Sequence, residues 1–263
     1  MELTVEDLAR RRGQYGVDGG VEALGPLGAL SLALMGLGLA LLVVSRNWWG
    51  GASLAAGLCV LVFCAGYLYT TRAGKFWAWA GILRELGLRG DERVLDLGCG
   101  RGAVLLQAAR LLPRGRAVGI DIWRRRDQSG NGIESTRRNA ELEGVADRVE
   151  LHTGDMTSLP FEDASFDLVL SSLAIHNIRG RDGRTQAIDE AARVLRPEGR
   201  LVIADLAFTG QYASRLREGG LEDVVRRRVG WRFWFGLPGG MPRLLTARKP
   251  RPVPDATPRP ASP

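Results

Sequence analysis

Between Glu22 and Arg72 the chain contains a single charged residue, Arg46, and this scarcity of charge constrains the fold more than any other feature. Arg46 divides the stretch into residues 25–45 and residues 50–71, which hold 21 and 22 consecutive uncharged positions around the turn. An α-helix of about 20 apolar residues crosses roughly 30 Å of bilayer hydrocarbon. The two stretches therefore predict two transmembrane helices joined by a short turn.

Aromatic and basic residues at the ends of these stretches indicate how the hairpin lies in a membrane. Four aromatic residues flank the predicted spans where interfacial side chains are expected: Trp48, Trp49, Tyr67 and Tyr69. Basic residues gather outside the hairpin rather than in its turn: Arg10, Arg11, Arg12, Arg72 and Lys75. Because positive charge favours the cytoplasmic side, we expect the N-terminal segment (1–24) and the chain after residue 71 to be cytoplasmic. The hairpin, residues 25–71, would then be the multi-pass segment in the cell (inner) membrane.

Two other interpretations of the apolar stretch stay open. A signal peptide has an apolar core of roughly 7 to 15 residues, whereas here the first run is longer and a second one follows directly. A buried helical hairpin of a soluble domain would carry a polar stripe if it were amphipathic, and neither stretch has one.

The composition is that of a folded protein with an excess of positive charge. The 263 residues are 45% hydrophobic and 25% charged, with a formal net charge of +7. That charge is compatible with binding to nucleic acid or to an anionic membrane surface, and an arginine-rich proteome would also explain it. It therefore indicates no particular partner by itself. The spacing of Cys59, Cys64 and Cys99 matches no disulfide framework or metal site.

From about Lys75 short apolar runs alternate with amphipathic stretches, which is typical of a parallel sheet covered by helices. The predicted strands are residues 93–98, 116–122, 148–155, 165–173 and 199–206, with weaker candidates at 221–228 and 243–247. The predicted helices are residues 75–88, 103–112, 133–143, 186–195 and 211–218. The fold class is α/β: a Rossmann-like, mostly parallel seven-stranded sheet with helices on both faces, preceded by the two transmembrane helices. Residues 72–249 would form this domain, and the proline-rich residues 250–263 a disordered tail.

A glycine-rich turn after the first predicted strand indicates a ligand site. Residues 94–104 are VLDLGCGRGAV, in which Asp96 is followed by Gly98, Gly100 and Gly102 and then by a helix. Because glycine has no Cβ, a ligand can approach the backbone closely. A helix N-terminus alone favours phosphate, but the carboxylate of Asp96 suits a cationic ligand better.

The same turn satisfies the looser dinucleotide fingerprint G-x-G-x-x-G/A, in which an acid about 20 residues further on binds ribose. Asp121 occupies that position at the end of the second strand. Asp155 is an additional acid at the end of the third strand. It is not part of the dinucleotide fingerprint, and it therefore distinguishes a dinucleotide site from a site for another cofactor.

Five segments together resemble the class I S-adenosylmethionine-dependent methyltransferases in order and spacing: VLDLGCGRG, GIDI, GDMTSLPF, FDLVLSSLAIHNI and ARVLRPEGRLVIAD. The resemblance covers roughly residues 75–208 and implies S-adenosyl-L-methionine as the cofactor. It implies that Gly98, Gly100 and Gly102 line the methionine part, with Asp96 near the ammonium group.

The resemblance also implies where the adenosine would lie. Asp121 would accept from both ribose hydroxyls, and Ile122 would pack on the adenine. Asp155 would accept from the adenine amine, with Met156 donating its backbone N–H to a ring nitrogen. Ser171, at the end of the fourth strand, would bring backbone near the transferable methyl. For each acid the alternative is a helix cap or a surface ion pair.

Methyl transfer from a sulfonium requires alignment and exclusion of water more than proton transfer. If a general base takes part, His176 is the candidate, because it follows the fourth strand and titrates near neutral pH. A structural role for His176 is the alternative, and His152, within a strand, is expected to be structural. Asn177 could orient a polar group of the acceptor.

Two basic clusters remain. Arg124, Arg125 and Arg126 fit either a solvated face or a docking patch for anionic headgroups. Residues 226–240 interleave arginines with aromatic side chains, which suits RNA stacking or, in an anchored protein, an interfacial or substrate-covering segment.

The sequence therefore predicts a membrane-anchored methyltransferase acting on a small-molecule or lipid acceptor, and the anchor favours a lipophilic one such as a quinone precursor. Arsenite, a substrate of some similar enzymes, is not expected, because their set of thiolates is missing and Cys99 is the only cysteine outside the spans. The alternatives are an NAD(P)-dependent oxidoreductase and a non-catalytic cofactor-binding membrane scaffold. A nucleic-acid partner is not expected, because no nucleic-acid-binding module accompanies the basic clusters.

Overall fold

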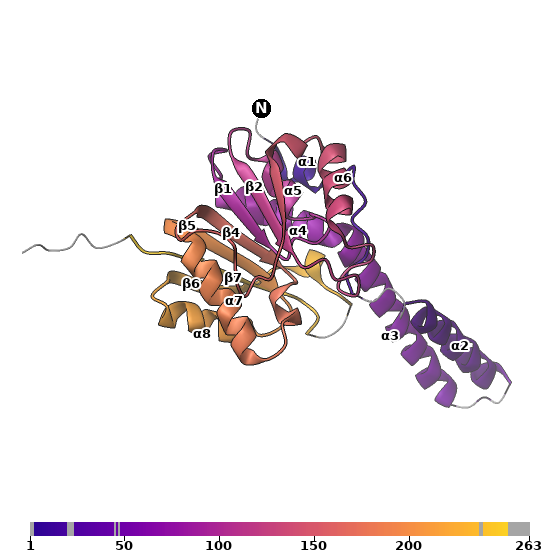
Figure 1. The fold of residues 1–263 in the computed structure, drawn as a ribbon. Coiled ribbons are helices and arrows are strands. Elements are labelled where there is room, and N and C mark those ends of the chain that lie inside the picture. The colour runs from indigo at the N-terminus through magenta and orange to yellow at the C-terminus, as the bar shows by residue number, and fades with distance from the viewer. Residues whose placement is uncertain (1–2, 20–23, 45, 47, 237–238, 252–263) are drawn as a thin grey trace, which may run out of the picture.

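The computed structural model describes residues 3–19, 24–44, 46, 48–236 and 239–251. A seven-stranded sheet forms its centre (Figure 1). The strands are β1 (Arg93–Leu97), β2 (Arg116–Asp121), β3 (Val149–Thr153), β4 (Phe166–Ser172), β5 (Leu195–Asp205), β6 (Glu222–Arg228) and β7 (Arg243–Arg248). Most of the predicted tail, residues 252–263, lies outside the described residues.

The strand order is β3-β2-β1-β4-β5-β7-β6. The first five strands in this order are parallel, and β7 pairs antiparallel with both β5 and β6. This arrangement confirms the predicted Rossmann-like, mostly parallel sheet. The order reverses between β1 and β4, which is where open α/β sheets form a ligand crevice at the carboxyl ends of their strands.

Helices cover both faces of the sheet, as predicted (Figure 1). The helices of the domain are α4 (Lys75–Leu86), α5 (Leu105–Arg110), α6 (Ile133–Glu143), α7 (Arg181–Val194) and α8 (Thr209–Glu218). Short 3-10 turns are η3 (Ala146–Arg148), η4 (Ile175–Asn177) and η5 (Trp231–Phe233).

Alternating strand residues supply a separate core on each face. Val94 and Leu168 pack with α4 and α5 in one core, whereas their neighbours Leu95 and Val169 pack with α7 and α8 in the other. This is the two-residue periodicity of a strand that is buried on both sides.

Two predicted boundaries are wrong. Helix α7 begins at Arg181, five residues before the predicted start, because its polar first turn has no apolar periodicity. Strand β5 begins at Leu195 rather than at residue 199. The register between β4 and β5 shifts after Leu195, and Glu198 has a positive φ of 65°, so residues 196–199 form an irregular bulge instead of a simple turn.

The N-terminal residues pack on the domain, which the sequence pattern gives no reason to expect. Helix α1 (Val5–Ala9) begins with a capping box on Thr4. Leu8 is fully buried, and Gln107 of α5 donates to its carbonyl at 3.1 Å. Residues 13–19, the N-terminal strap, then run beside the loop that follows β2, where Asp18 forms an isolated β-bridge with Gln128.

The apolar stretches form two long helices, α2 (Leu24–Val43) and α3 (Trp49–Tyr69), which project together from the domain (Figure 1). Each is long and apolar enough to cross a membrane, and only 11% of each candidate span is buried. The helices pack through small residues, because a Cβ on Gly38 or Gly57 would lie within 3 Å of the other helix. Ser31 donates to the carbonyl of Gly57 at 2.7 Å. Close packing through glycine and interhelical hydroxyl bonds is typical of membrane helices.

Helix α3 continues into the domain without a linker. The π-helical turn η2 (Thr70–Gly74) connects it to α4, so that one helix runs from residue 49 to residue 86. Residues 230–236 pack against this junction. Thr70 donates to the carbonyl of Trp234, and a Cβ on Gly74 would clash with the backbone of Arg232.

Candidate functional site

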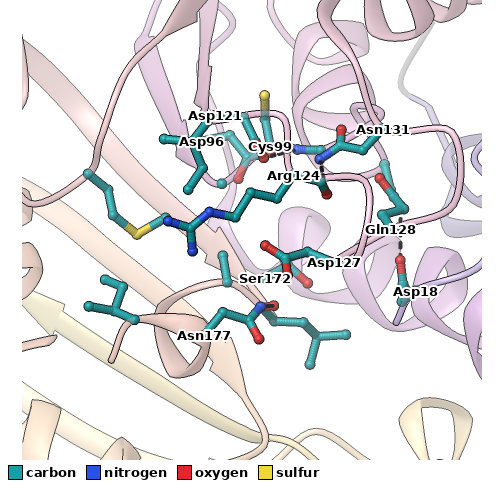
Figure 2. Close-up of a pocket in the computed structure, with 18 of the residues that line it drawn as sticks. Asp18, Asp96, Cys99, Asp121, Arg124, Asp127, Gln128, Asn131, Ser172 and Asn177 are labelled. Carbon is teal, nitrogen blue, oxygen red and sulfur yellow. Dashed lines mark hydrogen bonds between the residues drawn. The ribbon is translucent and has the colours of Figure 1, made fainter. Parts of the chain in front are cut away.

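A cavity of about 740 Å³ opens at the carboxyl ends of the parallel strands (Figure 2). Its walls come from the turns after β1, β2, β3 and β4, from the N-terminal strap and from the first residue of α4. The volume lies in the range of pockets that bury a small molecule, about 300 to 1,000 Å³.

The glycine turn after β1 forms one wall of this cavity. Gly98 and Gly100 have φ angles of 71° and 51°, and both line the cavity. A Cβ on Gly98 would clash with Ala174, and one on Gly100 would lie 2.6 Å from the side-chain oxygen of Gln128. Only glycine fits this backbone, which therefore presents its peptide groups to the cavity.

Asp96 lies at the base of the cavity with one oxygen unpaired. Its side chain is buried, and Oδ1 has no hydrogen-bond partner among the described residues. Burial raises the pKa of Asp96 to about 8. An unpaired buried acceptor is costly, so the site is complete only with a donor in the cavity. A cationic donor would also favour ionisation of the carboxyl.

Asp121 ends β2 at the next position around the cavity. Its Oδ2 accepts the Gly100 N–H at 2.9 Å, and its Oδ1 accepts the Trp123 N–H at 2.6 Å. Burial raises the pKa of Asp121, and these two N–H bonds oppose the shift. The contacts fix the carboxylate at the edge of the cavity, directly beside the glycine turn.

Asp155 and Ile122 complete this end of the cavity. Asp155 accepts from the backbone and hydroxyl of Thr157 through Oδ1, at 2.9 Å each, and Oδ2 accepts no hydrogen bond from the described residues. Ile122 is 39% exposed, an unusual position for a branched apolar side chain beside three carboxyls. An apolar surface next to free acceptors suits a flat heterocycle with a donating amine.

Most of the predicted cofactor residues meet at this cavity. Those that line it are Asp96, Gly98, Gly100, Asp121, Ile122, Asp155 and Met156. Gly102 and Ser171 lie behind the wall instead. The Ser171 hydroxyl donates to the carbonyl of Leu97 at 3.0 Å, and Ser172 lines the cavity in its place, because consecutive strand residues point to opposite faces.

His176, the predicted general base, does not line the cavity. Its Nδ1 bonds to the fully buried carboxylate of Asp205, which also accepts the His176 backbone N–H at 3.1 Å. The next residue, Asn177, does face the cavity. His176 therefore connects the loop after β4 to Asp205 at the end of β5.

Several cavity residues escaped the sequence analysis because they are distant in the chain. Lys75 donates from Nζ to both oxygens of Asp18, at 2.7 and 2.8 Å, and its side chain is 5% exposed. Gln128 donates to Asp18 at 2.9 Å and accepts the Arg101 N–H of the glycine turn at 2.8 Å. Nothing in the sequence pattern connects positions 18, 75 and 128.

The arginine cluster after β2 also lies at the cavity rather than on a remote face. Arg124, Arg125 and Arg126 all line it, together with Asp127 and, from the loop after β4, Arg179. Figure 2 shows the Arg124 side chain extending across the cavity.

These residues fit S-adenosylmethionine. Asp96 would meet its ammonium, the glycine turn its methionine backbone, and Asp121, Ile122 and Asp155 its adenosine. When bound, it would supply a methyl group on a sulfonium.

Comparison with known proteins agrees with this class of site. Residues 95–203 match the family model of a methyltransferase domain. A solved S-adenosylmethionine-dependent methyltransferase from Methanosarcina mazei superposes with a TM-score of 0.51 at 19% identity, covering 64% of this chain and 97% of that one. Residues 95–203 therefore resemble a methyltransferase domain, the sheet has the fold of S-adenosylmethionine-dependent methyltransferases, and this similarity implies S-adenosylmethionine as the cofactor.

Curated relatives extend the comparison. The 27-O-demethylrifamycin SV methyltransferase of Amycolatopsis mediterranei is 36% identical over 141 residues, 51% of this chain and 48% of that protein. The ubiquinone/menaquinone biosynthesis C-methyltransferase UbiE of Roseobacter denitrificans is 31% identical over 133 residues, 51% of this chain and 49% of that protein. The chain thus spans about half the length of these two relatives.

Proposed function

We propose that the protein is a membrane-anchored methyltransferase that transfers a methyl group from S-adenosylmethionine to a lipophilic small-molecule acceptor at the cytoplasmic face of the inner membrane. One observation carries the proposal. Asp18, just before the apolar hairpin, and Lys75, just after it, form an ion pair in the wall of the cofactor cavity. The residues at the base of the hairpin therefore also form part of the cavity wall.

The exposure of α2 and α3 supports their insertion in a bilayer. Large apolar side chains face outward along both helices, including Leu32 at 69% and Leu58 at 53% exposure. An apolar surface of this extent on a soluble monomer would be unusual. A buried hairpin within the described chain is inconsistent with that exposure. Removal of α2 as a signal peptide would also remove the strap, whose Asp18 is paired with Lys75.

The position of the cavity supports an acceptor that resides in the membrane. Lys75 in the cavity wall lies six positions after Tyr69, the end of α3. At about 1.5 Å per residue this is roughly 9 Å along a helix axis. The headgroup layer on each side of the hydrocarbon is about 5 to 8 Å thick. A helix along the membrane normal would therefore hold the site at the outer boundary of the headgroup layer.

The relatives support a small-molecule acceptor. One is named for a rifamycin precursor and another for ubiquinone and menaquinone biosynthesis. Of these two classes, the quinone precursor agrees with a site at the bilayer surface, because it combines an apolar tail with a polar ring.

The test uses the full chain reconstituted in lipid nanodiscs, with S-adenosylmethionine labelled in its methyl group and a membrane extract of the source cells as the acceptor pool. We expect label in the organic phase, and none with Asp121→Ala. Label confined to water-soluble products would refute the lipophilic acceptor, and no transfer to either phase would refute the activity. Release of the protein from cell membranes by sodium carbonate would refute the transmembrane hairpin.

A further inference from the structure

The part of the cavity away from the predicted adenosine site is lined by residues with no assigned role. It lies between the strap, the loop after β2 and the end of β4. The acceptor would occupy this region, because the opposite end is formed by the residues that fit adenosine. Besides the arginines that line the cavity, the polar side chains on these elements are those of Asp18, Lys75, Asp127, Gln128, Ser172 and Asn177.

Most of these groups are engaged with one another or with the domain. Asp18 accepts from Lys75 and Gln128, at 2.7 to 2.9 Å. The Ser172 hydroxyl accepts from the indole N–H of Trp79 at 2.9 Å. The oxygens of Asp18 and the hydroxyl of Ser172 are therefore already hydrogen-bonded within the protein.

Asp127 differs from them. Figure 2 shows its carboxylate directed into the cavity, which Ser172 and Asn177 also line. Among the described residues the one partner of this carboxylate is Arg126, at 3.5 Å, and the Arg126 side chain is 61% exposed. A contact of this length to a solvated guanidinium is weak. The carboxylate is therefore free to accept a hydrogen bond from a bound molecule.

The backbone of Asp127 is nevertheless held in place. Its carbonyl accepts the Gly19 N–H of the strap at 2.8 Å, and its own N–H donates to the carbonyl of Arg124 at 3.2 Å. The neighbouring Gln128 is tied to both the strap and the glycine turn. A fixed backbone with an unengaged carboxylate is the arrangement that a positioned proton acceptor requires.

We propose that Asp127 is the general base of the methyl transfer, and that the acceptor carries an O–H or N–H group which this carboxylate deprotonates. The inference rests on the proposed function. In the transfer, the oxygen or nitrogen forms a bond to the methyl carbon while the carbon–sulfur bond breaks and its electron pair stays on sulfur. The acceptor proton moves to Asp127 and then leaves to water through the cavity mouth.

The charges that face Asp127 are consistent with this role. Arg126 and Arg124 lie on its own loop, and Asp121 is close enough for the charge of Asp127 to raise its pKa. Across the cavity, the Lys75 ammonium is neutralised by Asp18. Arg125, on the same loop, and Arg179, from the loop after β4, also line the cavity.

The experiment compares the wild type with Asp127→Asn in nanodiscs, using the labelled methyl donor and the membrane extract. Asp163→Asn is the matched control, since this exposed carboxylate pairs with Arg193 away from the cavity. Removal of a general base typically lowers the rate 10²- to 10⁴-fold, and we expect a fall in kcat of at least about 100-fold for Asp127→Asn. Binding of S-adenosylhomocysteine, measured by calorimetry, should change less than about threefold.

The pH dependence provides a readout that a structural role would not produce. Hydroxide can replace a missing base, so the residual rate of Asp127→Asn should rise about tenfold per pH unit between pH 7 and 9, while the wild-type rate levels off. Equal wild-type and variant rates would overturn the assignment, as would a loss of S-adenosylhomocysteine binding that matches the loss of rate. An inactive wild type would refute the proposed function itself, and the base assignment with it.

Discussion

Replacing Lys75 by methionine should destabilise the protein strongly, because the change leaves a carboxylate without its cation in the cavity wall. The Lys75 side chain is 5% exposed and that of Asp18 is 19% exposed, with two N–O distances below 3 Å. Removing one partner of a buried ion pair costs about 3 to 5 kcal/mol. Asp18 keeps its bond from Gln128 and some contact with water, which places the expected loss near the lower limit, about 3 kcal/mol.

Thermal unfolding in detergent, followed by near-ultraviolet circular dichroism, measures this effect. A domain of about 150 to 250 residues loses roughly 2 to 4 °C in Tm per kcal/mol, so Lys75→Met should lower Tm by about 6 to 12 °C. Methionine retains most of the apolar stem, and the change therefore tests the charge rather than the packing.

Two variants serve as controls. Arg215→Met breaks the pair with Asp189, in which both side chains are about 40% exposed, and it should cost less than about 1 kcal/mol. In the double variant Asp18→Asn/Lys75→Met no unpaired charge remains, so its loss in Tm should be smaller than that of Lys75→Met alone. A shift below 2 °C for Lys75→Met, or a double variant less stable than the single one, would refute the reasoning.

Three further changes have defined outcomes. Burial raises the folded-state pKa of Asp96 to about 8, so the unfolded chain binds fewer protons than the folded one between about pH 4 and 8. The free energy of unfolding should therefore fall as pH rises through this window. In urea titrations, the free energy of unfolding of Asp96→Asn should depend less on pH than that of the wild type. Cofactor binding should also release protons near pH 7, seen as a buffer-dependent calorimetric enthalpy with S-adenosylhomocysteine. Gly74→Ala should lower Tm, because its Cβ would clash with the Arg232 backbone. Gly81→Ala is the control, because no atom lies within 4 Å of the new Cβ. It should leave Tm unchanged, or raise it by removing backbone freedom from the unfolded chain. Asp121→Asn should weaken S-adenosylhomocysteine binding at least about tenfold in calorimetry, because charged acceptors make stronger hydrogen bonds.

The sheet could be predicted closely because the sequence signal of a strand lies within the strand itself and its flanking residues. Strands such as β1 and β2 are short apolar runs bounded by glycine, proline or charge, and the predicted starts of both strands agree with the structure. The glycine turn and the acids that follow the strands were found for the same reason, since parallel strands bring their carboxyl ends to one edge.

The rest of the site depends on contacts between distant segments. The strap residue Asp18 meets Lys75 across 57 positions and Gln128 across 110. No periodicity records such a pairing, and an isolated acid before an apolar stretch resembles ordinary surface charge. The contact of His176 with Asp205 could not be predicted either, because Asp205 ends a different strand, 29 positions further along the chain.

The unbroken helix from Trp49 to Leu86 also determines which molecules the enzyme can reach, given the proposed hairpin. A domain on a flexible tether would sample many heights and tilts, whereas one that shares a helix with its span has a single immersion depth. Acceptors would then arrive by lateral diffusion within one leaflet, and selection would depend on how deep the reactive atom sits relative to the glycerol backbone. Lengthening the tail of an amphiphile should matter little, but moving its nucleophile by one turn of the helix, about 5 Å, should exclude it.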